Sequence, residues 1–407
     1  MSYQVLDVNS VTEYAKSTPN IANILGEGIY KAQEVGDGNL NLVFIVCNPT
    51  NGASVVIKQA LPYLRCVGES FPLGEQRMLF EIRSMLTYSH TVPSLVPQIF
   101  HSDESKYTLA MQNLSEHIIM RKGILEQKVY PRFADDITDF IAKTTFSTST
   151  FGMDSMKRTK LAMDFATNTE LRKLTEDFVF TFPYMHNETN RHNPLIEGAA
   201  KHIKTNGEFK AKAMELKYIF MTKAEALLHG DLHTGSVMLN EKETFVIDSE
   251  FAFLGPIGFD LGAVVGNLLM ASLAMKARNK DEYGEWLEST AYDVMDKFAS
   301  KYETLLIDGE GAMYDNKYWH ETGREHKVAL AKKITSDIIK ESIGFAGCKM
   351  ARRQLGVAHI LEIDSIEDDK MRAAVETKVL DLAKEMVINY QNVKDAKELK
   401  QLLTDAK

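Results

Sequence analysis

The first third of the chain consists of apolar, β-branched runs that are separated by clusters of turn-forming residues. A run of this kind predicts a strand, and short turns between such runs favour antiparallel pairing of neighbours. A glycine-rich turn follows the first run, and the sequence NPTNG separates the second run from the third. The three predicted strands cover residues 31–35, 41–47 and 53–59. We therefore expect an antiparallel meander here.

A helix and a further strand are expected to complete this region. Residues 73–86 have the spacing of an amphipathic helix. The apolar side of this helix is expected to carry Met78, Ile82, Met85 and Leu86. Residues 107–114 resemble another strand that leads into a connecting segment.

Beyond about residue 115 the pattern becomes mainly helical. Three segments stand out there: a polar connection at 186–194, a compact strand region near 236–248, and an amphipathic helical tail from about 370 to 405. This change of pattern places a domain boundary near residues 112–117. We predict an N-lobe over 1–114 and a C-lobe over 115–407.

The length and charge of the chain narrow the choice of protein class. With 407 residues the chain exceeds one compact core, which favours two lobes. It carries 47 Lys and Arg against 56 Asp and Glu, a formal net charge of -9. This acidic excess argues against a nucleic-acid binder, which needs a basic face. A local basic pocket for a small anion is compatible with this acidic excess.

Cysteine usage and hydropathy favour a cytoplasmic protein without a membrane partner. Cys47, Cys66 and Cys348 are scattered and odd in number, which fits a reducing compartment. The first residues show no basic segment followed by an apolar run, so no signal peptide is expected. The longest apolar stretch, Leu261 to Met275, is shorter than the ~20 residues that span a bilayer. We expect a buried helix there.

The strongest chemical signal is the pair of sequences HGD at 229–231 and DSE at 248–250. A short apolar strand is expected to end at Asp248, and Asp231 is expected in a loop after a helix that ends near Leu228. Glu250 would lie on the same side as Asp248 if the backbone stays extended. Carboxylates of this kind bind Mg²⁺ together with substrate phosphates, and a metal-free carboxylate accepts a proton from a hydroxyl.

The alternative is that these acids are surface turn residues, because Asp commonly ends strands. For one isolated Asp this alternative would be favoured. An apolar strand that delivers two acids at its end, with His-Gly-Asp before it, reverses that preference.

Two further features lie in the N-terminal third. Gly36 and Gly38 precede Asn41 in a G-x-G-x-x-N pattern that permits close backbone approach to phosphates. A plain hairpin turn needs the same glycines. A strand follows the pattern, so it is no dinucleotide fingerprint. Lys58 ends the β-branched run VVIK. It is either an outward-facing strand residue or a cation for ATP phosphates.

A phosphate-binding lysine requires a carboxylate partner from the following helix. Glu81 is the best candidate, and Glu75 is second. The order of a glycine-rich turn, a strand lysine, a helix glutamate, an HGD loop and D-x-E matches the order of parts in the kinase fold. A P-loop is excluded because G-x-x-x-x-G-K-[ST] is absent from the sequence.

Four segments closely resemble the 5-methylthioribose kinase family of the protein-kinase-like superfamily, which also includes choline and aminoglycoside kinases. They are HGDLHTGS (229–236), DSEFAFLGPIGFDLG (248–262), GDGNLN (36–41) and IGFAGCKMARRQLGVAH (343–359). The resemblance extends from about residue 30 to about residue 400. It implies an α+β, bilobal kinase fold with a small N-lobe of antiparallel sheet and one main helix, and a larger, mainly helical C-lobe.

One departure from the neighbouring families concerns the metal ligands. Choline and aminoglycoside kinases carry HGD-x-x-x-x-N, and this chain has Ser236 where they have the Asn ligand. The resemblance implies that Glu250 replaces the lost oxygen. The family usually has Asp-Pro-Glu, so Ser249 is a small departure outside the ligand set.

The resemblance also implies individual roles. Asp231 would orient and deprotonate the 1-hydroxyl of the sugar, and Asp248 and Glu250 would bind Mg²⁺–ATP. Asn41 and Lys58 would contact the ATP phosphates. The backbone of Gln112, Asn113 and Leu114 would hold adenine, whereas other members have acidic residues at the first two positions.

The acceptor end has its own candidates. Arg352 and Arg353 match a paired-arginine feature near the sugar site, and the alternative is that they satisfy the end of a helix. His229 and His233 are interpreted as buried scaffold residues of the HGD loop. Asp260 is expected to accept backbone N–H groups from that loop.

The implied reaction is ATP-dependent phosphorylation of 5-methylthioribose to 5-methylthioribose 1-phosphate, a step of methionine salvage. ATP and Mg²⁺ are the implied cofactors, and a homodimer is expected from the family. A choline or aminoglycoside kinase is the nearest rival, and Ser236 with the D-x-E motif speaks against it. A pseudokinase scaffold is a rival of another class, and Lys58, Asp231, Asp248 and Glu250 speak against that.

Overall fold

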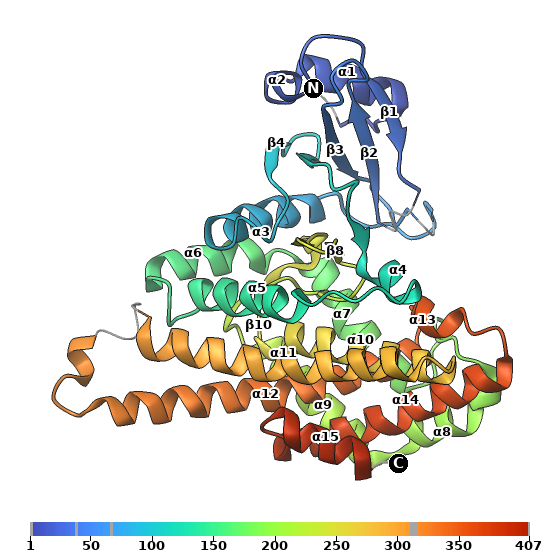
Figure 1. The fold of residues 1–407 in the computed structure, drawn as a ribbon, viewed down its shortest axis with the longest axis vertical. Coiled ribbons are helices and arrows are strands. Elements are labelled where there is room, and N and C mark those ends of the chain that lie inside the picture. Colours follow the sequence, from blue (N-terminus) through green and yellow to red (C-terminus); the bar gives the residue numbers. More distant parts are fainter. Residues whose placement is uncertain (1–2, 37–39, 66–67, 310–315, 406–407) are drawn as a thin grey trace.

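A computed structural model of the chain describes residues 3–36, 40–65, 68–309 and 316–405, so Gly38 and Cys66 lie outside the described residues. A β-rich part with a few helices lies at one end of the molecule, and a larger helical part lies below it (Figure 1). This arrangement confirms the expected α+β, kinase-like fold. The proposed boundary after residue 114 stays a prediction.

A five-stranded antiparallel sheet organises the N-terminal part, in the order β1-β2-β3-β5-β4. Its strands are β1 (Lys31–Glu34), β2 (Asn41–Cys47), β3 (Ser54–Ala60), β4 (Ile99–Asp103) and β5 (Thr108–Gln112). The predicted meander and the predicted strand at 107–114 are confirmed. Strand β4 was not expected, because all of its residues are half-buried and no apolar alternation marks it.

Both faces of this sheet are covered, which explains the nearly continuous burial of β3. On one face, Phe44 and Ile57 pack against α1 (Val8–Ser17) and α2 (Pro19–Leu25). On the other face, a cluster that includes Val56 and Ala60 packs against α3 (Arg77–Thr91). Alternate residues of a strand point to the same face. Lys58 therefore shares the α3 face with Val56 and Ala60.

The helices of the N-terminal part differ from the prediction in two respects. Helices α1 and α2 precede the sheet and were not expected, although α1 begins with a capping box between Asp7 and Ser10. The main helix α3 spans Arg77–Thr91 instead of 73–86. The expected apolar side is correct for Met78, Ile82 and Met85, but wrong for Leu86, which is 40% exposed.

The C-terminal part contains most of the helices and two small sheets (Figure 1). Its helices are α4 (Met120–Leu125), α5 (Phe133–Thr148), α6 (Ser155–Ala166), α7 (Thr169–Phe180), α8 (Glu197–Thr205), α9 (Gly207–Thr222), α10 (Gly258–Ala277), α11 (Asp281–Asp308), α12 (Arg324–Leu355), α13 (Leu361–Asp364), α14 (Asp369–Asn389) and α15 (Ala396–Asp405). Its strands are β6 (Ile118–Ile119), β7 (Ala226–Leu228), β8 (Val237–Leu239), β9 (Thr244–Val246) and β10 (Phe253–Gly255).

Two expectations for this part need correction. No helix ends near Leu228 in the described residues, because α9 ends at Thr222 and Leu228 belongs to β7, which pairs with β10. The tail is helical but not continuous, because α14 ends at Asn389 and α15 starts at Ala396. The strand region near 236–248 is confirmed as the hairpin of β8 and β9.

Helix α10 forms the centre of the helical part. It is the one described helix that is apolar and long enough to cross a membrane, and 94% of its apolar window is buried inside the protein. Gly262 lies against α12 so closely that a Cβ there would meet Ser342 O at 2.4 Å. Glycine thus permits the close approach of α10 and α12. The buried helix expected at Leu261–Met275 is confirmed.

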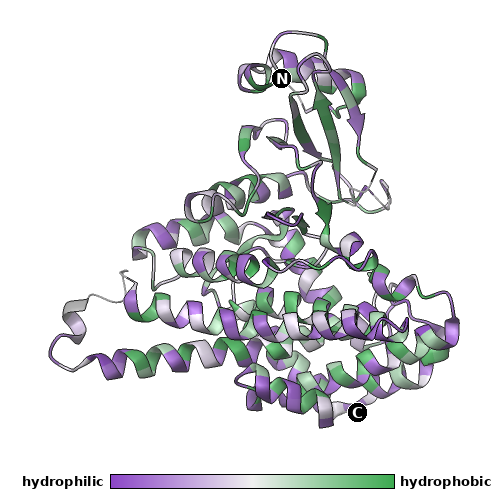
Figure 2. Cartoon of the chain, in the orientation of Figure 1, coloured by the Kyte–Doolittle hydropathy of each residue, from purple (hydrophilic) through white to green (hydrophobic). Residues whose placement is uncertain are grey.

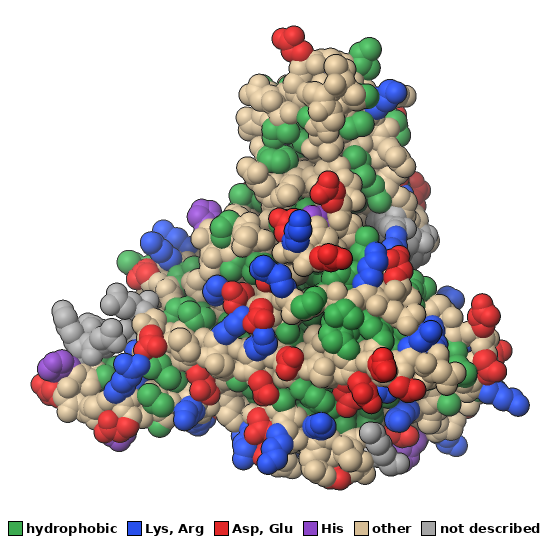
Figure 3. Space-filling model, in the orientation of Figure 1, with side chains coloured by type: hydrophobic (Ala, Val, Ile, Leu, Met, Phe, Trp, Pro, Cys, Tyr) green, Lys and Arg blue, Asp and Glu red, His purple; other side chains and the backbone are tan. Residues whose placement is uncertain are grey.

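The surface of the helical part is mixed in charge. Figure 2 shows hydrophobic colour concentrated on the central strands, whereas the long helices alternate hydrophobic and hydrophilic segments. On the face seen in Figure 3, basic and acidic side chains are interspersed over the described residues, and neither sign forms a continuous surface. This view is in keeping with the net charge of -9.

Candidate active site

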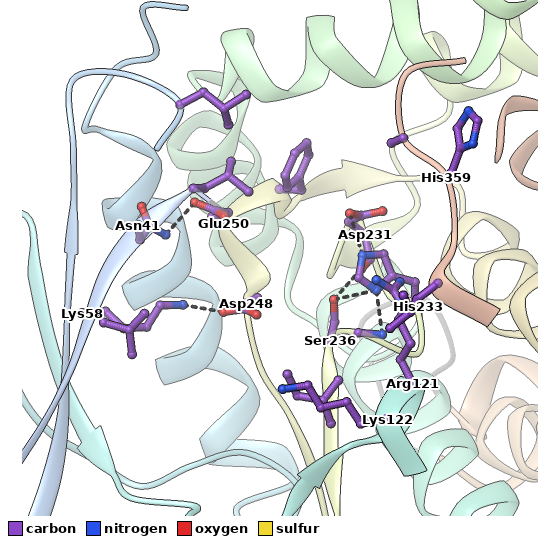
Figure 4. A pocket seen from close by; sticks show the side chains of 18 of the residues that line it. Asn41, Lys58, Arg121, Lys122, Asp231, His233, Ser236, Asp248, Glu250 and His359 are labelled. Carbon is purple, nitrogen blue, oxygen red and sulfur yellow. Dashed lines mark hydrogen bonds and ion pairs between the residues drawn. The ribbon is translucent and has the colours of Figure 1, made fainter. Parts of the chain in front are cut away.

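A cleft of about 710 Å³ lies between the sheet and the loops of the helical part. It is lined by Lys58 from β3 and by Asp231, Asp248 and Glu250 from the loops after β7 and β9. The three acids expected to converge do so, and Figure 4 shows their side chains facing the same space. The interpretation of HGD and D-x-E as surface turns is therefore excluded.

Lys58 joins the two sides of this cleft. Its Nζ lies 2.5 Å from Glu81 Oε1 and 2.5 Å from Asp248 Oδ1. Burial alone would lower the pKa of Lys58, but the carboxylates of Asp248 and Glu81 raise it above its ordinary value. Lys58 is therefore an ammonium. Glu81 is confirmed as its helix partner, and Glu75 makes no ion pair with it.

The backbone after Asp248 is not extended, so the condition for placing Glu250 on the same side by strand alternation is not met. Asp248 adopts a left-handed conformation (φ 64°), and a short 3₁₀ turn follows at Ser249–Phe251. Asp248 remains partly open to the cleft, with 43% of its side chain exposed, whereas Glu250 is 5% exposed. Burial raises the pKa of Glu250 to about 7. The turn thus places both carboxylates in the cleft, the Asp248 side chain partly exposed and the Glu250 side chain buried.

Arg77, the first residue of α3, holds Glu250 in place and was missed in the sequence analysis. Its Nε lies 3.3 Å from Glu250 Oε2 and donates to Asn41 Oδ1 at 3.1 Å. Its other nitrogens donate to the backbone carbonyls of Leu40, Leu61, Leu73 and Gly74. In the sequence, the only sign of this role was an arginine at the first position of an amphipathic helix.

Asn41 makes contacts within the protein in addition to the phosphate contact that the family implies. Its Nδ2 donates to Glu250 Oε2 at 3.0 Å, and its Oδ1 accepts from Arg77 (Figure 4). Both ends of the amide are thus engaged within the protein. Asn41 lines the cleft but is only 3% exposed. The structure assigns its side chain to the orientation of Glu250, and a phosphate contact stays a prediction.

The HGD loop is fixed from beneath by Asp260 of α10. Asp260 accepts the backbone N–H groups of His229 at 2.7 Å and of Gly230 at 3.0 Å, as expected. Gly230 has φ +86°, and a Cβ there would lie 2.2 Å from Phe251 O. His229 Nε2 lies 2.8 Å from Ile247 O. These contacts confirm the scaffold roles of His229 and Asp260.

Asp231 lies between two nitrogen groups. Its Oδ1 is 3.2 Å from Lys349 Nζ, and its Oδ2 is 3.4 Å from His233 Nε2. Burial would raise the pKa of Asp231, but Lys349, His233 and the arginine pair hold it well below its ordinary value. Asp231 is therefore ionised over the physiological pH range.

His233 and Ser236 both support the same loop. His233 Nδ1 accepts the N–H of Gly235 at 2.9 Å, so the ring proton belongs to Nε2, which faces Asp231. Burial lowers the pKa of His233 well below its ordinary value, which keeps the ring neutral. Ser236 Oγ donates to Asp231 O at 3.0 Å. The residue that replaces the neighbouring families' Asn ligand thus braces the loop.

The two arginines at the end of α12 differ in their contacts. Arg353 lines the cleft, is 6% exposed, and donates to Ala358 O at 3.2 Å and His359 O at 3.4 Å. These two carbonyls belong to the segment after α12 and not to the helix end that the alternative proposed. Arg352 Nε is buried and has no hydrogen-bond partner among the described residues. Both arginines act electrostatically on Asp231.

A second, smaller cavity of about 340 Å³ adjoins the first, and both are lined by Lys58 and Asp248. Its walls are mainly apolar, and they include Val43, Ile45, Val56, Met111, Met238 and Ile247. The connecting residues Gln112, Asn113 and Leu114 line one side. Gln112 Oε1 accepts from Gln98 N, and Asn113 Nδ2 donates to Ser54 Oγ. The two polar side chains thus make local contacts within the N-terminal part.

Two carboxylates of the cleft are candidate metal ligands. Among the described residues no group of three or more His, Cys, Asp and Glu side chains is arranged to hold a metal by itself. Mg²⁺ commonly binds through one or two carboxylates together with phosphate oxygens and water. Asp248 and Glu250, which line the same cleft, fit that pattern.

Comparison with known proteins gives consistent matches. The family model described as "Phosphotransferase enzyme family" matches residues 31–298. "Methylthioribose kinase 1" of Oryza sativa subsp. japonica is 38% identical over 94% of this chain and 91% of its own length. "Methylthioribose kinase" of Geobacillus sp. (strain WCH70) is 37% identical over 91% of this chain and 89% of its own. "Methylthioribose kinase" of Escherichia coli O45:K1 is 36% identical over 90% and 88%.

Proposed function

The chain belongs to the methylthioribose kinase family of phosphotransferases, and from this premise we propose that it transfers the γ-phosphoryl group of ATP to 5-methylthioribose. The acceptor is the 1-hydroxyl of the sugar, and the product is 5-methylthioribose 1-phosphate. This reaction is a step of methionine salvage. The observation that carries this proposal is the convergence of Lys58, Asp231, Asp248 and Glu250 on one cleft beside an apolar slot.

The nucleotide would occupy both cavities. The apolar slot suits adenine, with the backbone of Gln112–Leu114 as its hydrogen-bonding edge. The phosphates would then extend toward Lys58, whose ammonium is held at the junction of the two cavities by Glu81. Asp248 and Glu250 would hold Mg²⁺, which when bound neutralises charge on the phosphates.

Asp231 would act on the acceptor. Phosphoryl transfer passes through a loose transition state, so catalysis consists mainly of positioning and electrostatics. A carboxylate with a strongly lowered pKa is a weak base. Asp231 therefore chiefly orients the sugar hydroxyl and accepts its proton late, when the bond to phosphorus is forming. Arg352 and Arg353, near Asp231, would contact the sugar or the transferred group.

Other features follow from the family and are part of this proposal. We expect a cytoplasmic enzyme, without nucleic-acid or membrane partners, that assembles as a homodimer. Sedimentation analysis of the purified protein tests the dimer directly.

Phosphoryl-transfer assays with methylthioribose, choline, homoserine and an aminoglycoside test the function. We expect turnover with methylthioribose and little with the other acceptors. The Asp231→Asn variant should lose turnover by roughly 10²–10⁴-fold while it still binds ATP. Turnover with choline alone would identify the rival kinase class. Nucleotide binding without turnover on any acceptor would favour the pseudokinase.

A further inference from the structure

Lys349 is a buried lysine beside Asp231 that lies within the family-like segment 343–359, and the sequence alone gave it no role. It lies on α12, is 3% exposed, and its Nζ approaches Asp231 Oδ1 to 3.2 Å. We propose that Lys349 is a positioning residue for phosphoryl transfer, whose ammonium holds the Asp231 carboxylate in the orientation that receives the acceptor hydroxyl. This inference rests on the proposed function, because it concerns the residue that would orient the sugar.

The surroundings of Lys349 are built to hold an ammonium against Asp231. The close packing of α10 on α12 brings the ring of Phe259 beneath Lys349, with Nζ 4.3 Å from the ring centroid. A cation over an aromatic face is stabilised when it is removed from water. A buried ammonium also needs a carboxylate partner, and Asp231 is the one within hydrogen-bonding distance of Lys349 among the described residues.

The contacts of Asp231 form a clamp with two sides. Lys349 Nζ approaches Oδ1 from α12 to 3.2 Å, and His233 Nε2 lies 3.4 Å from Oδ2 on the side of the HGD loop. Nitrogen groups beside both oxygens restrict rotation of the carboxylate. Each oxygen keeps a further lone pair, and 24% of the Asp231 side chain stays exposed to the cleft. The clamp thus leaves an acceptor position for a substrate hydroxyl.

The charged groups around Lys349 determine when the clamp is intact. Asp231 and His233 face it from the HGD loop, Asp260 faces it from α10, and Arg352 and Arg353 belong to its own helix. Burial, together with the two arginines, lowers the pKa of Lys349 to about 8, although Asp231 opposes this shift. Above that pH the ammonium becomes a neutral amine, and the ion pair with Asp231 is lost. Turnover should therefore decline at alkaline pH.

Steady-state kinetics of Lys349→Met and Lys349→Arg with methylthioribose and saturating Mg²⁺–ATP test the clamp. We expect Lys349→Met to lower kcat by roughly 10²-fold, the cost of a small misplacement of a reacting group, with little change in ATP binding by calorimetry. Lys349→Arg keeps the charge and should regain part of that loss. It should also abolish the decline of kcat above about pH 8, because an arginine stays protonated there.

Lys223→Met is the matched control. Lys223 is a partly buried lysine that pairs with Glu225 and Glu341, whereas Lys349 pairs with Asp231. Its loss should change thermal stability without changing kcat. A folded Lys349→Met variant with kcat within about twofold of the wild type would overturn the inference, as would an unchanged alkaline decline in Lys349→Arg.

NMR titration of ¹³C-labelled lysine side chains makes the test independent of turnover. The Lys349 signal should titrate near pH 8, and Asp231→Asn should shift its pKa further down, because the carboxylate raises it. If the pKa of Lys349 is unchanged in Asp231→Asn, the clamp is contradicted, even if Lys349→Met fails to fold. Failure of the proposed function can be distinguished from failure of this inference. If the proposed function is wrong, the wild-type protein does not phosphorylate methylthioribose, but the titration of Lys349 is unaffected.

Discussion

The hydroxyl groups of Ser84 and Ser249 lie 2.7 Å apart and join helix α3 to the loop that carries Asp248 and Glu250. Ser84 Oγ also lies 3.3 Å from Ser249 O. Both residues are buried. The family usually has proline at the position of Ser249, which cannot make this contact. In this chain the hydroxyl pair couples the helix of Glu81 to the loop of Asp248 and Glu250.

A double-mutant cycle with Ser84→Ala and Ser249→Ala should measure this coupling. We expect a coupling free energy of about 1 kcal/mol in urea denaturation, the usual net value of one buried hydrogen bond. Ser89→Ala on the same helix serves as a control, because Ser89 Oγ donates only to its own helix, at Leu86 O. Strictly additive effects of the two substitutions would show that the hydroxyl pair contributes nothing.

Asp248→Ala should weaken Mg²⁺–ATP binding, in contrast to Asp231→Asn. Lys58 would keep its contact with Glu81, so the phosphate-side ammonium stays in place while one of the two metal ligands is lost. Calorimetry with and without Mg²⁺ separates the contributions. Wild-type protein should bind ATP more tightly with Mg²⁺, and this difference should largely vanish in Asp248→Ala. An undiminished effect of Mg²⁺ in the variant would remove Asp248 from the ligand set.

The local signals of the sequence were sufficient for four of the five strands of the sheet, β4 excepted, and for the acids. The β-branched runs predicted β1–β3 because their side chains meet buried faces, and HGD with D-x-E marked Asp231, Asp248 and Glu250 by type and spacing. Lys58 was recognised because an ammonium is unusual in a β-branched strand. Its partner Glu81 followed from the order of strand and helix.

The missed residues depend on contacts between distant segments. Lys349 reaches Asp231 because glycines let α12 approach α10, and although these residues lie in family-like segments, the sequence does not show which side chains meet. Arg77 reaches Glu250 across the cleft from another element. The short strand β7 was missed because its pairing with β10 is defined only in the folded chain. Tertiary packing decided each of these cases.

The pH dependence of stability should contain a contribution from Glu341 on α12. Its side chain is 12% exposed, and Oε2 is buried without a hydrogen-bond partner among the described residues. Burial raises the pKa of Glu341 to about 7 from an ordinary value of 4.5. Between these values the folded protein binds the additional proton, so stability falls as pH rises toward 7.

Glu341→Gln should remove this contribution. From pH 5 to pH 8 the wild type should lose on the order of 1 kcal/mol of unfolding free energy that the variant does not lose. Urea denaturation at both pH values measures this difference. Lys223 would keep Glu225 as a partner at 2.8 Å. Glu285→Gln, at an exposed position of α11, controls for the loss of one carboxylate. The same pH profile for Glu341→Gln and wild type would contradict the raised pKa.

Arg77 should be the most sensitive position of the N-terminal part. Arg77→Met leaves the buried Glu250 carboxylate without its cationic partner and several backbone carbonyls without their donor, so we expect a loss of about 3–5 kcal/mol in the free energy of unfolding. Arg77→Lys keeps the charge but not the planar fork, and it should recover only part of this loss.

Arg83→Met is the matched control on the same helix. Arg83 pairs with Glu104 at the surface at 3.3 Å, and the two side chains are 37% and 56% exposed. An exposed pair of this kind contributes at most about 1 kcal/mol. Equal effects of Arg77→Met and Arg83→Met in urea denaturation would show that the buried network of Arg77 does not stabilise this side of the cleft.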